Sequence, residues 1–146
     1  MKQTDTIWVL ETNIDDCSGE VLGYTLERLL ENGARDAFYR PIYMKKNRPA
    51  YQLTVLCKQE DVDHLEDIIF SETTSIGIRR RQEIRTILDR SFRKLQTPFG
   101  EMDVKVVEVD GQMRAYPEYD TAKKLAKEQR VPLRVIYDAC TKAVQS

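Results

Sequence analysis

The alternation of two hydrophobic periods along the first 88 residues constrains the fold more than any other feature of this chain. Runs rich in β-branched and aromatic residues, which are typical of strands, alternate with segments whose apolar residues recur at helical spacing. In chain order these are strands at 6–10, 37–44, 51–57 and 76–87, with helices after the first and third of them. The order βαββαβ predicts an α+β, ferredoxin-like domain over residues 1–88, in which two helices cover one face of an antiparallel sheet.

Each of the two helical segments has one apolar face. The first is capped by Ser18 or Asp16 and ends at Asn32 and Gly33. Its apolar residues are Val21, Leu22, Leu26, Leu29 and Leu30. The second covers residues 59–70, and its apolar residues are Val62, Leu65, Ile68 and Ile69. Both patterns predict amphipathic helices that pack one side against the sheet.

Residues 89–146 predict a second, smaller lobe. Strands are expected at 92–97 and 102–109, and Asp110 with Gly111 is a hairpin signal. A helix at 118–129 follows, and Pro132 opens a last helix. We therefore expect a small C-terminal β-hairpin with a helical extension.

The charge balance excludes functions that need a strong overall field. The chain has 146 residues, with 23 Lys and Arg against 24 Asp and Glu, and a net charge of -1. This balance predicts no general attraction to nucleic acid or membranes, so any charge-based function is local. The apolar runs are far shorter than the roughly 20 residues that cross a bilayer.

The cysteine and histidine content also limits the possible chemistry. Three isolated cysteines and one histidine, His64, do not suit a zinc site made from these residues alone. A sparse, odd cysteine count suits a reducing compartment, and the N-terminus lacks the apolar region of a secretory signal. The expected location is the cytoplasm.

An acidic segment at the end of the first strand is the first candidate site. We expect a strand that ends near Leu10 and an acidic loop after it, with Glu11, Asn13 and Asp15 aimed to one side and Asp16 beside them. Hard oxygen ligands at this spacing suit Mg²⁺ or Mn²⁺. The alternative is that these residues only cap a helix and form a turn.

Two basic segments are candidates for binding a polyphosphate. Lys45, Lys46 and Arg48 lie in the predicted hairpin connection, and the stretch from Thr73 to Arg81 combines hydroxyls, a glycine and three arginines. Phosphate oxygens accept charge-assisted hydrogen bonds from such groups. Because no GxxxxGK[ST] or GxGxxG motif occurs, a nucleotide would be held by strand ends and hairpins. The alternative is a solvated or acid-paired strand face.

A third region follows the last predicted hairpin. Tyr116 and Tyr119 can stack on a base, and Glu118 can meet a cation. The alternative, which we favour for Tyr119, is a core residue in a helix that Pro117 starts. Cys17, within the acidic segment, is either a soft metal ligand or, more often for such residues, a small buried side chain.

Four ordered motifs together resemble one known family. They are ETNIDD at 11–16, PIYMKKNRPA at 41–50, ETTSIGIR at 72–79 and YPEYD at 116–120. Their combination is similar to the C-terminal domain of the LarC-type nickel-insertion protein, a nickel chelatase that completes the nickel-pincer nucleotide cofactor of lactate racemase. The resemblance covers nearly the whole chain. It departs from the family pattern at Tyr116, where lysine is expected, and at Asn47, where glycine is expected.

The resemblance implies a reaction and a division of roles. Ni²⁺ would be inserted into pyridinium-3,5-bisthiocarboxylic acid mononucleotide at the expense of CTP hydrolysis, with Mn²⁺ or Mg²⁺ on the nucleotide. The implied metal ligands are Glu11, Asn13, Asp15 and Asp16. The implied CTP-binding residues are Lys45, Lys46, Arg48, Thr74, Ser75, Arg79 and Glu118. Lys46, Arg48 and Asp16 would be the catalytic residues.

Complete family members resemble this chain only in their last third. Since the chain has one histidine and no cysteine cluster, we expect nickel chelation to need the N-terminal part of the family protein. We also expect a homo-oligomer. The alternative function is a non-catalytic oligomerisation or regulatory ferredoxin-like domain, because such modules often associate through sheet edges. RNA binding by the sheet is disfavoured, because the aromatic pair that it requires is not evident.

Overall fold

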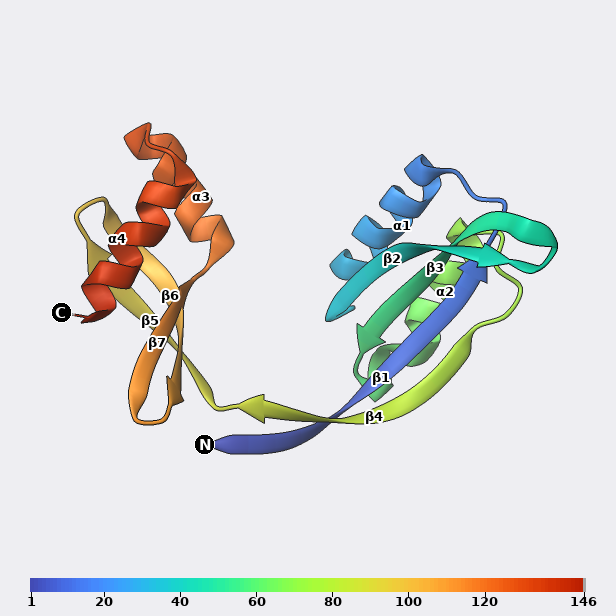
Figure 1. The fold of residues 1–146 in the computed structure, drawn as a ribbon, viewed down its shortest axis with the longest axis horizontal. Helices are drawn as coiled ribbons and strands as arrows, with labels where there is room; N and C mark the ends of the chain where they lie inside the picture. Colours follow the sequence, from blue (N-terminus) through green and yellow to red (C-terminus); the bar gives the residue numbers. More distant parts are fainter. Residues whose placement is uncertain (146) are drawn as a thin grey trace. The chain divides into compact units, whose positions relative to one another are not determined.

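The computed structural model describes residues 1–145, which form two compact units. One unit, called here the N-terminal unit, comprises Thr4–Arg85. The other, the C-terminal unit, comprises Met1–Gln3 and the chain from Thr86 on. Figure 1 shows the strands and helices of both units. Each unit has its own sheet and its own hydrophobic core.

The N-terminal unit contains a four-stranded sheet in the order β2-β3-β1-β4. Its elements are most of β1 (Lys2–Ile14), α1 (Gly19–Glu31), β2 (Asp36–Met44), β3 (Arg48–Cys57), α2 (Val62–Glu72) and most of β4 (Arg79–Leu88). Short 3₁₀ turns, Lys45–Asn47 and Gln59–Asp61, precede β3 and α2. β3 pairs antiparallel with both β1 and β2. The predicted succession of strands and helices is thus observed.

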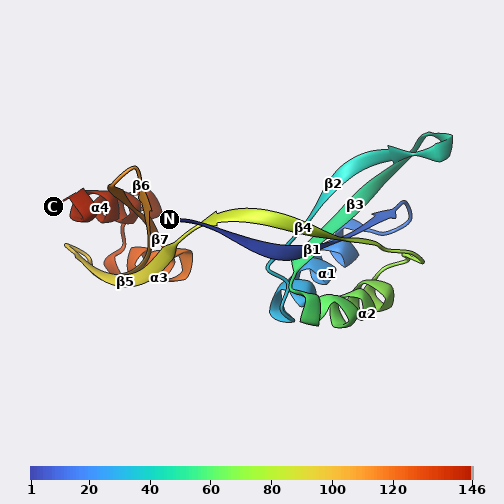
Figure 2. The same cartoon turned by 90° about the horizontal axis from the view of Figure 1, so that it is seen from below.

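Both helices of this unit lie on the same face of its sheet (Figure 2). The core between them contains Leu10 and Ile14 of β1, Leu22 of α1, Leu53 of β3 and Leu65 of α2, all almost fully buried. Successive side chains of a strand point to opposite faces of the sheet, so the residues between Leu10 and Ile14 point alternately toward the helices and away from them. Thr12 is buried on the helix-covered face, and Glu11 and Asn13 lie on the opposite, open face.

The helix predictions are confirmed in their main features. Ser18 is the N-cap of α1, and its hydroxyl accepts a hydrogen bond of 3.3 Å from the amide of Val21. All four apolar residues predicted for α2 are buried. Val21 and Leu30 of α1 are exposed, because the face of α1 that packs against the core is centred on Leu22, Thr25 and Leu29.

The first strand is longer than predicted. The acidic loop was expected directly after Leu10, but β1 continues to Ile14, and Glu11 and Asn13 pair with Thr54 and Gln52 of β3. The strand persists because β3 supplies partners along this whole stretch. The acidic residues therefore divide between a strand face and the short loop that contains Asp15 and Asp16.

The C-terminal unit contains a three-stranded antiparallel sheet in the order β5-β6-β7. Its elements are β5 (Arg90–Thr97), β6 (Gly100–Val109), β7 (Gln112–Pro117), α3 (Tyr119–Gln129) and α4 (Leu133–Gln145). The core joins one face of this sheet to the helices through Met102, Val104, Leu125, Ile136 and Cys140. No helix in residues 1–145 is long and apolar enough to span a membrane.

Two expectations for this unit were wrong. Pro117 ends a third strand, β7, instead of starting a helix, because residues 112–117 pair with β6 after the Asp110-Gly111 turn. Tyr119 is not a core residue: its side chain is 55% exposed at the start of α3, where Lys123 lies 5.7 Å from its ring centroid.

Candidate functional site

Three segments predicted to carry chemistry meet at the end of β1 in the N-terminal unit. Asp15 lies 3.4 Å from a guanidinium nitrogen of Arg48, at the start of β3. Asp16 accepts a hydrogen bond from the hydroxyl of Thr74, in the loop between α2 and β4. Asn13 accepts one of 3.0 Å from Arg79, at the start of β4. The acidic segment therefore contacts both basic segments.

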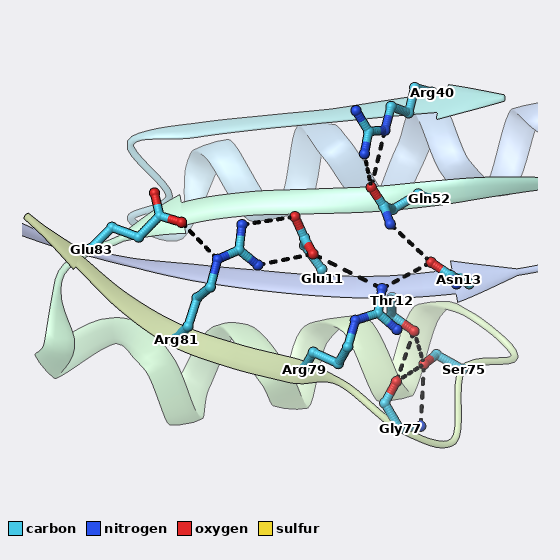
Figure 3. A network of polar contacts seen from close by, with 10 residues as sticks. All are labelled: Glu11, Thr12, Asn13, Arg40, Gln52, Ser75, Gly77, Arg79, Arg81 and Glu83. Carbon is cyan, nitrogen blue, oxygen red and sulfur yellow. Dashed lines mark hydrogen bonds and ion pairs between the residues drawn. The ribbon is translucent and has the colours of Figure 1, made fainter. Parts of the chain in front are cut away.

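Glu11 holds two arginines over the open face of the sheet (Figure 3). Its two carboxylate oxygens lie 3.1 and 3.0 Å from the terminal nitrogens of Arg81, and Arg79 lies 4.0 Å away. The hydrogen bonds from Arg81 lower the pKa of the Glu11 carboxyl, although its burial acts in the opposite direction. Glu11 and Glu83 together raise the pKa of Arg81. Glu11 is thus a fixed anion between cations.

A chain of amide and guanidinium hydrogen bonds crosses the same face (Figure 3). Asn13 Oδ1 accepts from Arg79 and, at 3.2 Å, from Gln52 of β3. Gln52 Oε1 accepts in turn from two nitrogens of Arg40 of β2, at 3.0 and 2.7 Å. The guanidinium groups of Arg40, Arg79 and Arg81 therefore lie on one polar surface, called here the arginine face.

Sequence reasoning missed Arg40 and Gln52. The alternation of side chains along β2 and β3 places Arg40 and Gln52 each on a definite face of the sheet. Their position opposite one another depends on the strand register, which cannot be taken from the sequence. A search for polar residues at alternate positions of both hairpin strands would have found them.

The loop that follows α2 is held to β1 by Thr12. The Thr12 hydroxyl contacts the Ser75 hydroxyl and donates a 2.8 Å hydrogen bond to the carbonyl of Gly77. Ser75 thus faces inward and fixes the loop, whereas Thr74 is exposed and faces Asp16. Ile76, between the anchored residues, is 99% exposed. Of the two predicted hydroxyls, Thr74 is the one open to a ligand.

Lys45 and Lys46 lie at the tip of the β2–β3 hairpin and are exposed. Neither forms an ion pair within residues 1–145. Lys46 and Asn47 have φ values of +61° and +56°, in the left-handed region. Glycine adopts this conformation most easily and asparagine tolerates it, which explains how Asn47 can replace the glycine expected at this position.

The predicted metal ligands have oxygen donors, but they do not form a closed cage. Within residues 1–145, no three His, Cys, Asp or Glu side chains are grouped so as to hold a metal ion. A nucleotide-bound Mg²⁺ or Mn²⁺ needs only one or two carboxylates, because phosphates and water fill the remaining positions. Asp15 and Asp16, both exposed, fit that requirement. Cys17 packs against the core, as its alternative interpretation predicts.

Glu118 belongs to the C-terminal unit. It precedes α3 as its N-cap residue, and its carboxylate lies 3.8 Å from the ammonium group of Lys105 on β6. Its contacts in the structure are thus with residues of its own unit.

Comparison with known proteins places these residues in a family. The model of the nickel insertion protein family matches residues 1–137. The chain belongs to the nickel insertion protein family. It is 51% identical, over 135 residues, to the pyridinium-3,5-bisthiocarboxylic acid mononucleotide nickel insertion protein of Alkaliphilus metalliredigens, which covers 92% of this chain and 32% of that protein.

Other members of the nickel insertion family agree. Identity to the protein of the same name from Acetivibrio thermocellus is 47% over 143 residues, covering 98% of this chain and 35% of that protein. The chain therefore spans about a third of the length of these curated relatives.

The fold is also that of a solved nickel insertion domain. The structure described as LarC2, the C-terminal domain of a cyclometallase involved in synthesis of the NPN cofactor of lactate racemase, in its apo form, superposes with a TM-score of 0.90. Sequence identity is 42%, over 99% of this chain and 100% of that one. A protein from Methanopyrus kandleri gives a TM-score of 0.66 at 25% identity, over 91% and 85% of the two chains. The resemblance to the LarC-type C-terminal domain is confirmed.

Proposed function

We propose that this chain is the CTP- and divalent-metal-binding domain of a nickel insertion protein. The observation that carries the proposal is the meeting of the acidic segment, Arg48 of the hairpin and the loop from Thr74 to Arg79 at one end of β1. Family membership supports the nickel role, because relatives carry the name of a nickel insertion protein. The strand order β2-β3-β1-β4 supports the ferredoxin-like arrangement as the scaffold of this site.

The triphosphate is bound by cations that remain accessible. Within residues 1–145, Lys45 and Lys46 at the hairpin tip have no acidic partner. Arg48 pairs with the exposed Asp15, and Arg79 pairs with Glu11, which it shares with Arg81. Thr74 adds a hydroxyl. Charged donors fixed around a triphosphate stabilise the negative charge that develops as the phosphoryl group is transferred, so Lys46 and Arg48 are the proposed catalytic cations.

The divalent ion is held by the loop after β1. Asp16, with Asp15 beside it, would hold Mn²⁺ or Mg²⁺, and the bound ion neutralises charge on the phosphates. Glu11 and Asn13, predicted as further ligands, already bind Arg81 and Arg79. We assign them the positioning of these arginines, because a metal at Glu11 would have to displace a two-point guanidinium contact.

The whole protein would use this domain to drive metal insertion. Ni²⁺ and pyridinium-3,5-bisthiocarboxylic acid mononucleotide are the substrates in this proposal, CTP is hydrolysed, and the enzyme is a chelatase of the lyase class. The N-terminal part that the longer relatives possess would supply the nickel ligands. A cytoplasmic homo-oligomer is part of the same proposal.

The experiment that tests the proposal is thermal unfolding of the chain with Mn²⁺ and each of CTP, ATP, GTP and UTP. A ligand that binds only the folded state raises the unfolding temperature by mass action. We expect a rise with CTP and Mn²⁺ that is larger than with any other nucleotide and that needs the metal. Absence of a rise with all four nucleotides would contradict the proposal.

Variants separate the two halves of the site. Lys46→Ala and Arg48→Ala are expected to weaken CTP binding about tenfold each, since each removes a charge-assisted phosphate contact. Lys58→Ala is the matched control, because Lys58 is an exposed cation just after the other end of β3. Asp16→Asn is expected to reduce the affinity for CTP in the presence of Mn²⁺ more than the affinity for CTP without the metal. Full Mn²⁺ dependence in that variant would make Asp16 a turn residue only.

A non-catalytic oligomerisation or regulatory domain is the second candidate. The edge strand β4 favours it, because Ile84 on that strand is 80% exposed and exposed edges tend to pair with other chains. Under this function no nucleotide would raise the unfolding temperature, whereas Ile84→Lys would change the molecular mass in sedimentation.

A further inference from the structure

The edge strand β2 carries a cation and an aromatic ring that the proposed function does not use. The cation is Arg40 of the arginine face, and the ring is that of Phe38, two residues before it. Ala37 belongs to the core under the helices, so Phe38 and Arg40 both lie on the opposite, open face of the sheet. Arg40 is exposed, and Phe38 is 42% exposed. Both side chains are therefore accessible from the same side of the sheet.

The guanidinium group of Arg40 is held in place by an uncharged acceptor. Its Nε and one terminal nitrogen donate hydrogen bonds of 3.0 and 2.7 Å to Oε1 of Gln52. The amide of Gln52 is in turn fixed by a 3.2 Å hydrogen bond to Asn13. Within residues 1–145, Arg40 forms no ion pair. Its positive charge is thus positioned without being neutralised, and its other terminal nitrogen is open to a ligand.

The other two guanidinium groups of the arginine face differ in how far they are neutralised. Arg81 contacts both carboxylate oxygens of Glu11 and lies 2.6 Å from Glu83, so its charge is matched. Arg79 uses a single terminal nitrogen for the 3.0 Å hydrogen bond to Asn13 and for the 4.0 Å approach to Glu11. Because a guanidinium group has five N–H donors, Arg79 retains several for a ligand.

Arg40 and Arg79 stand at the two ends of one polar row across the sheet (Figure 3). Arg40 lies opposite Gln52, and Gln52 lies opposite Asn13, which accepts the hydrogen bond from Arg79. The two guanidinium groups are therefore separated by the width of two amide groups. The row offers two separate places for negatively charged groups, with a surface of neutral amides between them.

We propose that the arginine face binds an aromatic ring that carries two carboxylate-type groups, one at Arg40 and one at Arg79, with the ring over the amides and beside Phe38. The proposal rests on the proposed function, in which pyridinium-3,5-bisthiocarboxylic acid mononucleotide, the compound in the names of the relatives, is a substrate. Guanidinium groups bind carboxylates through paired, charge-assisted hydrogen bonds. An aromatic side chain adds a favourable contact with the ring, which is cationic in this substrate.

The placement of Arg79 brings the two substrates of the proposed function together. Arg79 is one of the cations assigned to the triphosphate, and it also forms one end of the polar row. The second substrate would therefore lie next to CTP and on the same unit. The separation of the two guanidinium groups distinguishes this ligand from a phosphate, because a single phosphate meets only one of them and gains no contact between rings.

The test is calorimetric titration of the whole chain, at constant ionic strength, with pyridine-3,5-dicarboxylate and pyridine-3-carboxylate. The carboxylates stand in for thiocarboxylates, and the two compounds differ only in the number of these groups. We expect the dicarboxylate to bind about ten times more tightly, because its second carboxylate gains a charge-assisted contact. Equal affinities would overturn the proposal, and so would inorganic phosphate that binds as tightly as the dicarboxylate.

Variants locate the binding. Arg40→Gln is expected to weaken binding of the dicarboxylate about tenfold and to remove its advantage over the monocarboxylate. Phe38→Leu is expected to weaken binding of both compounds about threefold. Arg134→Gln is the matched control, since Arg134 is an exposed arginine on α4 of the C-terminal unit. Unchanged affinity for the dicarboxylate in Arg40→Gln would overturn the proposal.

CTP with Mn²⁺ is titrated into the same proteins. If CTP binds but the dicarboxylate does not, this inference fails while the proposed function stands. If Arg40→Gln weakens CTP binding as much as it weakens dicarboxylate binding, Arg40 belongs to the CTP site and the inference is again overturned. If neither ligand binds, the proposed function fails with it.

Discussion

Glu11 illustrates how one carboxylate can organise an open sheet face. Its side chain is only 16% exposed, although it lies on the face of the sheet that the helices do not cover. The residue remains charged because Arg81 and Arg79 surround it, and in return it fixes where both guanidinium groups lie. Arginines without such an anchor would lose more conformational entropy on binding a phosphate. Glu11 therefore prepares the arginine face for an anion.

The first prediction concerns the pH dependence of stability. Because the pKa of Glu11 is lowered in the folded state, its contribution is present above its ordinary value of 4.5 and is lost as pH falls through the folded pKa. Glu11→Gln is expected to cost about 1 kcal/mol of unfolding free energy at pH 7 and less in acid. Urea denaturation of both proteins between pH 3 and 7 measures this, and an equal difference at every pH would contradict it.

The sequence was sufficient to predict which types of residue belong to the candidate site, but not which of them contact one another. Asp15, Asp16, Arg48 and Thr74 stand out in the sequence because hydroxyls, acids and cations cluster there, and the structure brings them together. That Ser75 turns inward depends on Thr12, whose side is fixed by the continuation of β1. Pairings across strands follow from register, which no single segment encodes.

The elements themselves were largely predictable from local pattern. Both helices of the N-terminal unit follow from their spacing and end signals, since Ser18 and Gly33 act directly on the backbone. Strand ends were less predictable, because β1 extends as far as β3 supplies partners. The third strand β7 was missed because Pro117 was interpreted as a helix start, whereas pairing with β6 decides the conformation of Tyr116 and Pro117.

The second prediction belongs to helix α1. Gly33 follows its C-cap with a φ of +105°, and an added Cβ would lie 3.3 Å from Asp61. Gly33→Ala is therefore expected to lower the unfolding free energy by about 1–2 kcal/mol. Gly23→Ala is the matched control within α1, where a Cβ meets nothing within 4 Å.

Gly23→Ala is expected to raise stability by about 0.5–1 kcal/mol, because alanine loses less entropy in a helix. Chemical denaturation of the two variants measures both effects. If the two substitutions shifted stability in the same direction, the backbone conformation at Gly33 would not be the cause.

At the scale of the whole molecule, the two hydrophobic clusters have no residue in common. The third prediction is that a cavity made in one core lowers the stability of the unit that contains it and not that of the other unit. Ile136→Ala, at a fully buried position of α4, is expected to destabilise the C-terminal unit by about 2–5 kcal/mol. Amides of α3 and α4 would then exchange faster with solvent, while amides of β3 would keep their protection.

Leu53→Ala, a fully buried position of β3, provides the reciprocal control. It is expected to accelerate exchange in the N-terminal unit only. Faster exchange throughout the chain in either variant would show that the two units unfold together.

The anchored loop after α2 offers a place to attach a reporter. Thr12 holds the residues on either side of Ile76, so the side chain at position 76 can change without loosening the loop. A fluorescent label at this position would stand next to Thr74, and hence close to the acid that it contacts. The arrival of a charged ligand could then be followed in real time, with the wild-type contacts of the binding groups left in place.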